Sequence, residues 1–472
     1  VQDARWFRLI DVPVEANTGR LIFVEKPGER NRFVTRRAPF RVYDAMRPVE
    51  PPLKADAAGG PVAALRLEIP IPRGARPGRR QYEITITCDG GTAASHFRLD
   101  VAVHKAVIPP VGRASLPYSN WFNLDNMATR HGLRPWSGGH WRMIERYAAM
   151  MLHARQNTFP VGWGVVFRRG RDGLELERPR LRRLVKLLTR AGLHYIEGGH
   201  VARHSGGWHS PTFDIAVGGP RATAPEGNAD LARAARQLMD EINRHNWAGR
   251  WLQHVADEPS KANAADYRVL AGMVRRHFPG LPLIDAVADD TMSGSIDIWV
   301  PQAHRFQQNI EHYRVQQTLG DQVWFYTCCV PGGPWLNRLL DMELLRPALL
   351  GWAAALFGLD GFLHWGLNQY GPPERPFEAN VMFLRHDGEG LPAGDTHIVY
   401  PGDGGPWSSL RLEAQREGLE DYELLHRLTA RRPAFAKRVL ARAIRGMDDY
   451  TKDVRVFRGA RRALLKACST EE

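Results

Sequence analysis

The chain has 472 residues, of which 43% are hydrophobic, 9% aromatic and 24% charged. This length is about three times the ~150 residues typical of one domain, so the chain can bury a large core and is expected to contain at least two domains. The composition excludes collagen-like, disordered and small disulfide-stapled proteins. The 64 Lys and Arg residues exceed the 51 Asp and Glu residues by 13, a balance that favours acidic partners. Because Arg is scattered through every segment and is not gathered in a basic stripe, we expect no nucleic-acid binding.

The four cysteines, Cys88, Cys328, Cys329 and Cys468, match neither a disulfide framework nor the spacing of a zinc site. No apolar run approaches the ~20 residues needed to cross a bilayer, so no membrane span is expected. A chain that begins at Val1 and not at Met is expected to be processed or trimmed, which slightly favours a secreted or periplasmic protein over a cytoplasmic one.

Residues 1–112 are expected to form a β-sandwich accessory domain. Short runs of alternating, β-branched or aromatic residues are separated by Pro and Gly clusters, and hairpins are expected to join them, with one tight turn at Asp89-Gly90-Gly91. The expected strands include RLIFVEK, FRVYDAMR, ALRLEIPIP, QYEITITC and FRLDVAVHKAVI.

Residues 113–430 alternate between strand-like and helix-like segments about eight times, a pattern that fits a (β/α)8 TIM-type barrel. Catalytic residues of such barrels lie at the C-terminal ends of the strands, which are rich in polar and aromatic residues in this chain. The expected strands end near Asn123, Gly164, His200, Pro259, Asp289, Gln302, Pro331 and Tyr370, and the clearest helices are Gly139–His153, Arg178–Ala191, Asn228–Asn246, Asn263–Phe278 and Glu343–Phe357.

The last part of the chain is expected to be helical. The segment SSLRLEAQREGLEDYELLHRLTA carries leucines in helical phase and is expected to close the barrel. Residues 431–472 are then expected to form a short C-terminal extension with two basic helices.

The segment RWLQHVADEPSK is the most informative for function. Asp257 and Glu258 follow an apolar strand, and Pro259 ends that strand where catalytic residues of a barrel are expected. Partial burial and a neighbouring carboxylate both favour a carboxyl group that stays protonated near neutral pH, so Glu258 is the candidate general acid at a glycosidic oxygen. Alternatively, the Asp-Glu-Pro-Ser sequence could start a helix, with Asp as its cap and Pro in its first turn.

Adjacent carboxylates cannot flank a sugar as the separated pair of an ordinary glycosidase does. If the sugar carries a 2-acetamido group, its carbonyl oxygen can attack the anomeric carbon, and Asp257 needs only to orient the amide and stabilise the charge that develops. This role requires a kinked strand end, because successive side chains of a regular strand face opposite ways. A conventional mechanism would instead need a remote nucleophile, for which Glu197, Asp289 and Asp290 are the candidates.

Three stretches of the sequence resemble a known family: ADEPS, WFYTCCVPGGPWLNRLLDMELLRPALLGWAAALFGLDGFLHWGLNQY and HIVYPGDGGPWSSLRLEAQREGLEDYELL. They cover about the C-terminal half and resemble glycoside hydrolase family 123 and its related uncharacterised domain family. The resemblance implies a β-sandwich followed by a barrel, and an exo-acting β-N-acetylgalactosaminidase that uses substrate assistance without metal or organic cofactor. It also implies that Asp257 orients the acetamido group, Glu258 is the acid/base and Tyr326 binds the acetamido carbonyl.

Other strand-end residues are candidates for sugar binding. Tryptophans offer apolar platforms for a pyranose face, and Asn, His and Gln side chains are suited to its hydroxyl groups. Each of them could also have a structural role, as a buried core ring, a helix cap or a satisfied polar group. The candidates are Trp365 with Asn368, Trp121 with Asn123, Trp163, His200, His254 and Gln302.

Two other patterns are discounted. A metal site built from His200, His204, His209 and Asp214 is not expected, because this loop is rich in Gly and lacks fixed helical spacing. The adjacent thiols of the TCC sequence could form a vicinal disulfide or a nucleophile, but packing in a buried strand is their expected role. Neither a metal nor a cofactor is therefore expected.

The sequence predicts a retaining exo-glycosidase that removes terminal β-linked N-acetylhexosamine from a glycan, GalNAc first and GlcNAc second. One alternative is a glycosidase of the same fold that acts on a different glycan, even an acidic one steered by Arg residues, with a remote carboxylate nucleophile. Another is a non-catalytic carbohydrate-binding protein, which the presence of Asp257, Glu258 and Tyr326 disfavours.

Overall fold

Eight parallel strands form a closed barrel in the computed structural model, which describes residues 4–50, 64–87, 94–287, 289–371, 375–382 and 389–470. Around the barrel the strands follow the order β10-β13-β14-β15-β16-β17-β6-β7, and each neighbouring pair is parallel. The expected barrel is therefore confirmed. Its strands are β6 (Tyr118–Asn120), β7 (Thr158–Val161), β10 (Tyr195–Gly198), β13 (Trp251–His254), β14 (Leu283–Val287), β15 (Ile298–Pro301), β16 (Gln322–Tyr326) and β17 (Gly361–His364).

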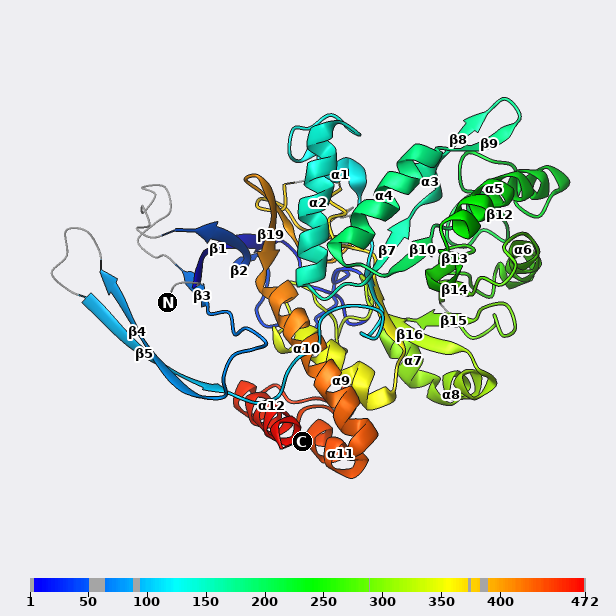
Figure 1. Cartoon of the computed structure of the whole chain (residues 1–472). Coiled ribbons are helices and arrows are strands. Elements are labelled where there is room, and N and C mark those ends of the chain that lie inside the picture. The colour runs from blue at the N-terminus through cyan, green and yellow to red at the C-terminus, as the bar shows by residue number, and fades with distance from the viewer. Residues whose placement is uncertain are drawn as a thin grey trace.

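Helices cover the outside of the barrel (Figure 1). In α4 (Arg178–Ala191), Leu181, Leu184 and Leu188 recur every three or four residues and are buried, and Gly192, with a φ of 111°, ends the helix in a left-handed conformation that favours glycine. The other helices between the barrel strands are α1 (Leu124–Thr129), α2 (Gly138–His153), α3 (Trp163–Val166), α5 (Pro225–Arg244), α6 (Ala264–His277), α7 (Ala303–Gln308), α8 (Ile310–Leu319) and α9 (Leu345–Phe357). Short additions are the 3-10 turn Ala248–Arg250 and the hairpins β8 (Phe167–Gly170) with β9 (Gly173–Leu176) and β11 (Ala202–His204) with β12 (Phe213–Ile215).

One connection departs from the expected (β/α)8 pattern. Residues 288–297 join β14 to β15, and the described part of this segment, 289–297, contains no helix. A helical crossover between parallel strands normally needs about a dozen or more residues, so this connection is too short to hold one. The expectation of a helix after each barrel strand is wrong at this point.

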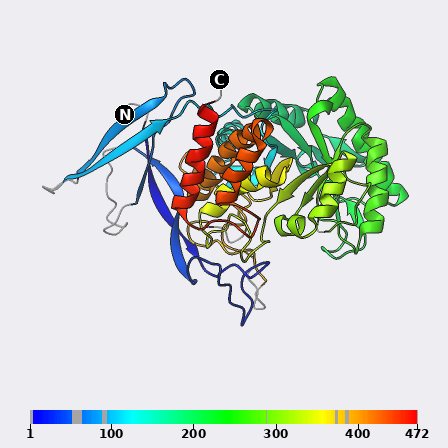
Figure 2. The same cartoon turned by 90° about the horizontal axis from the view of Figure 1, so that it is seen from below.

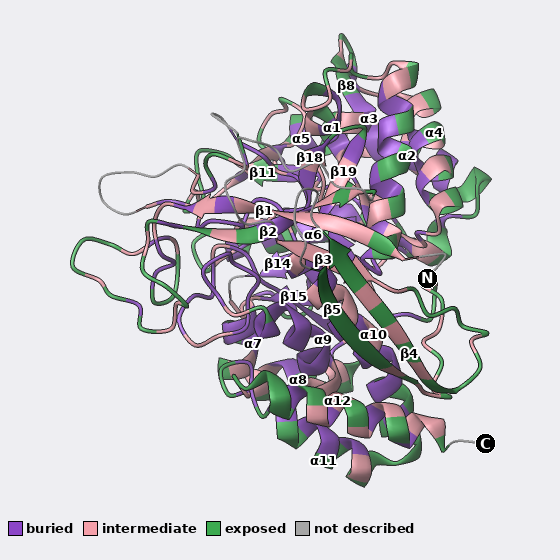
Figure 3. Cartoon of the chain, turned by 90° about the vertical axis from the view of Figure 1, so that its left-hand side faces the viewer, coloured by how far each residue is buried: buried purple, intermediate pink, exposed green. Residues whose placement is uncertain are grey.

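A five-stranded antiparallel sheet accompanies the barrel, in the order β18-β19-β2-β1-β3. Its members are β1 (Arg5–Val14), β2 (Phe40–Val49), β3 (Leu65–Glu68), β18 (Tyr400–Gly402) and β19 (Gly405–Ser409), so the sheet joins segments from before and after the barrel. A separate ribbon of β4 (Gly78–Thr87) and β5 (Ala94–Val103) lies at the edge of the molecule (Figure 2) and is largely exposed (Figure 3). The β-sandwich and the domain boundaries at residues 112 and 430 stay predictions.

The RLIFVEK segment is not a strand, contrary to expectation. Phe23 has a φ of 61°, and its N–H donates to the Cys329 carbonyl at 3.1 Å, while the Leu21 carbonyl accepts from Gly332 at 2.6 Å. The backbone groups of this loop are thus bonded to the loop after β16 and not to a strand ladder. The expected turn at 89–91 and Cys88 lie outside the described residues.

The C-terminal helices are present as expected. Helix α10 (Leu410–Arg431) packs closely against α9. A Cβ atom at Gly351 would lie 2.2 Å from the Gly418 carbonyl oxygen, so this contact requires a residue without a side chain. Two further helices, α11 (Pro433–Ala443) and α12 (Val454–Ser469), follow at the C-terminal end in Figure 2. Within the described ranges, no helix combines the length and apolar character that crossing a membrane requires.

Candidate active site

Aromatic side chains stand at the C-terminal ends of the barrel strands, above an apolar barrel interior. Trp121, which follows β6, and Trp365, which follows β17, are partly buried against the same cluster as Tyr326, the last residue of β16. The structure thus brings three of the predicted site residues together from three strands. The buried members of this cluster are Leu252, Ile284, Ala286, Ile298, Val300, Trp324, Tyr326, Cys328, Val330 and Leu363.

The chain turns sharply after β13, at the two adjacent carboxylates. One oxygen of Asp285, Oδ2, accepts from the N–H groups of Val255 and Ala256, both at 3.1 Å, in place of a backbone carbonyl of β14. Glu258 has a φ of 45°, a left-handed conformation that costs a residue with a side chain about 1 kcal/mol or more. The kink that Asp257 needs is present. A helix starting at this segment is wrong, because α6 begins only at Ala264.

Burial and mutual repulsion shape the protonation of the two carboxyl groups. Burial raises the pKa of Asp257 to about 8, aided by the charges of Glu258 and Asp285 and opposed by that of His254. Burial also raises the pKa of Glu258, against hydrogen bonds from Tyr326 and Gln302; the Tyr326 hydroxyl donates to Glu258 Oε1. Because two adjacent, partly buried carboxylates repel each other, the pair favours a state with one proton near neutral pH.

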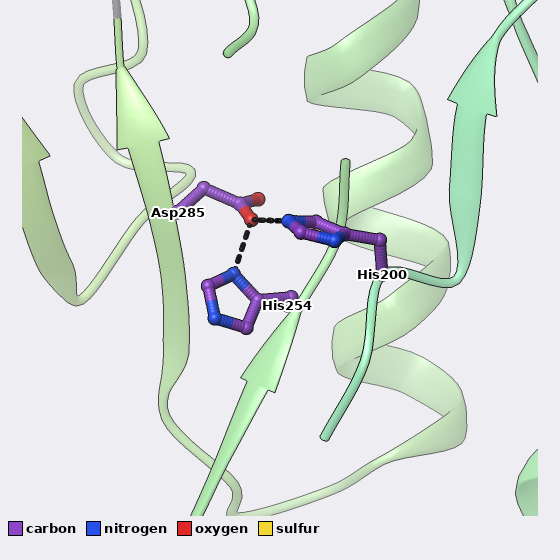
Figure 4. Close-up of side chains that lie close together, drawn as sticks. All are labelled: His200, His254 and Asp285. Atoms are coloured by element: carbon purple, nitrogen blue, oxygen red, sulfur yellow. Dashed lines mark hydrogen bonds and ion pairs between the residues drawn. The ribbon is translucent and has the colours of Figure 1, made fainter. Parts of the chain in front are cut away.

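A row of carboxylates and histidines lies beside this pair. His254 Nδ1 is 2.8 Å from Asp285 Oδ1, and His254 Nε2 is 3.8 Å from Glu197 Oε1. His200 Nε2 is 3.7 Å from the same Asp285 oxygen and 3.9 Å from Asp257 Oδ1. Figure 4 shows the Asp285 carboxylate between the two imidazole rings. Burial, and then the charge of His254, lower the pKa of His200 well below its usual value, so this ring is neutral.

Glu197 links this row to a predicted sugar platform. Its Oε2 accepts from Ser119 Oγ at 2.7 Å and from the indole nitrogen of Trp121 at 2.8 Å. The edges of the Trp121 and His254 rings also meet, with centroids 5.7 Å apart. The position of Trp121 is therefore set by a fully buried carboxylate, a role that the sequence did not indicate.

On the opposite side, sequence reasoning missed Asp395. Its Oδ1 accepts from the Trp365 indole nitrogen at 3.0 Å, and the residue is fully buried. Burial raises the pKa of Asp395 to about 7, opposed mainly by the Trp365 hydrogen bond. Asp395 lies in a loop before β18, and no periodic pattern in the sequence of that loop indicates a contact with the barrel. Only the fold places it behind Trp365.

Three predicted sugar-binding residues are placed differently. Asn368 and Asn123 bond to each other: the Asn123 N–H donates to Asn368 Oδ1 at 2.8 Å, and Asn368 Nδ2 donates to the Asn123 carbonyl at 3.0 Å. The Asn123 side chain also caps α1 by accepting from Asn126. Trp163 is buried in the large core that surrounds the barrel, against Phe167. Their contacts with sugar stay predictions.

The loop histidines do not form the discounted metal cluster. His204 Nε2 bonds to the Asp257 carbonyl at 2.8 Å, Asp214 accepts from Ser205, and His209 is exposed. Another group of donor atoms, from His200, His254 and Asp285, lies within 4.8 Å of one another. Within this group, His254 Nδ1 is hydrogen-bonded to Asp285 Oδ1 at 2.8 Å.

The adjacent thiols lie at the edge of the site. Cys328 is buried and Cys329 is partly buried against the barrel cluster, and their sulfur atoms are 3.9 Å apart without a disulfide. The hydrogen bond to Cys329 and burial together raise the pKa of Cys328 well above its usual value, so this thiol is protonated. These contacts agree with a packing role.

Comparisons with known proteins found one matching family model and several similar folds. Residues 221–428 match the family model for the glycoside hydrolase 123 catalytic domain. The whole fold is similar to that of a family 123 glycoside hydrolase from Clostridium perfringens, whose structural analysis concerns glycolipid glycan hydrolysis; the TM-score is 0.71 with 14% identity, over 98% of this chain and 85% of that chain. A β-galactosidase from Bacillus circulans sp. alkalophilus matches with a TM-score of 0.41 and 11% identity, over 66% of this chain and 56% of that chain. No match was found among curated proteins.

Proposed function

We propose that the chain, whose residues 221–428 match the model of the glycoside hydrolase 123 catalytic domain, is a retaining exo-glycosidase that releases terminal β-linked N-acetylhexosamine, GalNAc first and GlcNAc second. The observation that carries this proposal is the kink at Glu258, which lets two adjacent, partly buried carboxyl groups serve one site. An adjacent pair suits a reaction in which the substrate supplies its own nucleophile.

In the first step, Glu258 donates its proton to the glycosidic oxygen while the acetamido carbonyl oxygen attacks the anomeric carbon. The bond to the leaving group breaks, and a bicyclic oxazolinium ion forms. Asp257, as a carboxylate, accepts a hydrogen bond from the acetamido N–H and stabilises the positive charge. The shared proton of the pair thus belongs on Glu258 when substrate is bound, because the amide N–H favours the ionised form of Asp257.

In the second step, the Glu258 carboxylate takes a proton from water, whose oxygen attacks the anomeric carbon and reopens the ring. Two inversions give net retention of configuration. The Tyr326 hydroxyl, which bonds to Glu258 in the free site, is placed to turn to the acetamido carbonyl instead. Trp121 and Trp365 would stack on the sugar from two sides.

Two of the three candidates for a remote nucleophile, Glu197 and Asp289, have other partners, which supports substrate assistance. Glu197 is fully buried and accepts from Ser119 and Trp121. Asp289 bonds to the backbone of Lys261 at 2.8 Å and of Thr291 at 3.0 Å, as a turn-stabilising residue does.

The test is hydrolysis of aryl β-glycosides of the GalNAc and GlcNAc type, each with and without the 2-acetamido group. We expect release from the acetamido sugars only, and a loss in Glu258→Gln of about 100-fold or more in kcat, the size of a general-acid contribution. Glu311→Gln is the matched control, because Glu311 is 83% exposed on α8 and should keep full activity. Equal rates on the plain sugars would contradict substrate assistance. Glycolipid glycans form a second substrate panel, because the Clostridium perfringens structure concerns their hydrolysis.

A further inference from the structure

Three ionisable side chains stand in a row on neighbouring strands of the barrel: Glu197 on β10, His254 on β13 and Asp285 on β14. Each is at most 1% exposed. The imidazole of His254 has a carboxylate on both sides, with Asp285 Oδ1 at 2.8 Å from Nδ1 and Glu197 Oε1 at 3.8 Å from Nε2. The Nδ1 contact is a hydrogen bond, whereas the 3.8 Å separation from Glu197 is an ion-pair distance that leaves Nε2 without a hydrogen-bond partner among the described residues.

The surroundings of His254 favour its charged form. Burial lowers the pKa of His254, but the hydrogen bond to Asp285 and the charges of Asp285 and Glu197 outweigh burial and raise it to about 10. The other rings facing it, Trp121 and His200, present an uncharged indole and a neutral imidazole. His254 is thus the buried cation between two buried carboxylates, which would otherwise carry a large desolvation cost.

Each of the two carboxylates holds one wall of the active site. Asp285 accepts from the backbone N–H groups of Val255 and Ala256 at the kink before Asp257, and from the Tyr267 hydroxyl at 2.6 Å. Glu197 accepts from the indole nitrogen of Trp121 and from a serine hydroxyl. Three of these five hydrogen bonds, those from Val255, Ala256 and Trp121, reach either the turn before Asp257 or the sugar platform directly.

We propose that His254 is a positioning residue that bridges Glu197 and Asp285, so that Glu197 fixes Trp121 and Asp285 fixes the turn carrying Asp257 and Glu258. The proposal rests on the proposed function, in which this turn carries the catalytic pair. It replaces the prediction that His254 binds a sugar hydroxyl.

Removal of the cation has a defined consequence. Burial already raises the pKa of Asp285, and the hydrogen bond and charge of His254 oppose that rise. Without the imidazolium, Asp285 would take up a proton at a higher pH, and a protonated carboxyl accepts the Val255 and Ala256 N–H groups less strongly. The charge of His254 also opposes the raised pKa of Asp257. Both effects raise the pH at which the carboxyl groups of the site reach the protonation state that catalysis needs.

The first experiment detects the imidazolium without relying on activity. Nitrogen chemical shifts of the wild-type protein labelled with ¹⁵N-histidine are recorded from pH 6 to pH 9, and the His254 signals are assigned by their loss in His254→Gln. We expect both ring nitrogens to stay protonated up to pH 9. A neutral ring at pH 7 would overturn the proposal. So would Zn²⁺ that binds in equimolar amount and shifts the His254 and His200 signals together, because metal binding needs ring nitrogens without protons.

The second experiment separates positioning from simple structural support. In His254→Gln we expect kcat/KM near neutral pH to fall by roughly 100-fold and the pH optimum to rise by about one unit, as the carboxyl groups ionise later. His140→Gln, at a fully buried histidine of α2 whose Nδ1 accepts from the Trp136 N–H, is the matched control and should leave the pH optimum unchanged. A uniform loss with an unchanged pH optimum would overturn the proposal.

The two proposals can fail separately. If acetamido sugars are not hydrolysed, the proposed function fails, while the nitrogen shifts still report whether His254 is an imidazolium. If those sugars are hydrolysed and His254 is neutral, only the positioning role fails.

Discussion

The two sides of the barrel mouth hold aspartates that differ in neighbours and in exposure: the Asp257 side chain is 34% exposed, and Asp395 is fully buried. On the side of β13 and β14, Asp257 lies beside Glu258, Asp285 and two histidines. On the side of β17, Asp395 lies behind the ring of Trp365 and bonds to its indole nitrogen. Burial raises the pKa of both aspartates, to about 8 for Asp257 and about 7 for Asp395.

This contrast teaches that a raised pKa does not by itself mark a catalytic group. Burial is the largest cause for both aspartates, and it acts on any carboxyl group that loses water. The neighbours differ: a second carboxylate on a kinked strand end gives Asp257 a partner for proton exchange, whereas Asp395 has an indole donor that fixes a ring. We therefore expect Asp257 to govern kcat and Asp395 to govern KM.

The largest expected effect is that of Asp257→Asn. A neutral amide cannot stabilise the positive charge that develops on the acetamido group, so kcat on aryl GalNAc or GlcNAc should fall by roughly 100- to 1,000-fold while KM changes little. Steady-state kinetics of the purified variant measure both constants. A loss of less than about fivefold in kcat would show that Asp257 takes no part in the reaction. The two sides of the barrel mouth would then not differ in their catalytic role.

The pH dependence should come next in size. The carboxyl pair must hold one proton for Glu258 to act as an acid, and the raised pKa of Asp257, about 8, sets the pH at which that proton is lost. Above pH 8, kcat/KM should therefore fall by about tenfold for each pH unit. The measurement is a profile of kcat/KM between pH 4 and pH 10.

Tyr326→Phe sharpens this profile. The Tyr326 hydrogen bond lowers the pKa of Glu258, so its removal should move the alkaline limb to higher pH. Asp395→Asn, on the other side of the mouth, should move that limb less. If Asp395→Asn shifts the alkaline limb more than Tyr326→Phe does, the titrating group lies on the Asp395 side of the barrel mouth and not on the Asp257 side.

The barrel and the turn carrying Asp257 and Glu258 were predictable because their signals are local. Apolar runs that end in Pro, Gly or polar residues marked the strand ends, and DEP marked the turn after β13. The RLIFVEK segment shows where local signals fail, since its β-branched and aromatic residues lie in a loop whose backbone forms hydrogen bonds with the loop after β16. The β-propensity of the residues carries no information about a partner that is distant in the sequence.

The supporting carboxylates were missed for a related reason. Asp285 sits within the apolar strand LIDAV, and a charge in a buried strand signals a required partner, but the sequence does not say which one. Asn123 and Asn368 were expected to face a sugar, yet they bond to each other across 245 residues. Amide and carboxylate side chains serve structure and substrate with the same atoms, so only their neighbours in space separate the two roles.

The smallest expected effect tests the role of Asp395 directly. In Asp395→Asn the side-chain oxygen can still accept from the Trp365 indole, so KM should stay within about twofold of wild type. In Asp395→Ala the indole nitrogen loses a hydrogen bond worth about 1 kcal/mol, and KM should rise roughly fivefold with kcat nearly unchanged. Steady-state kinetics of the two variants measure this difference. If Asp395→Asn instead lowers kcat as strongly as Asp257→Asn, charge and not ring placement is what Asp395 supplies, and both sides of the mouth take part in the chemistry.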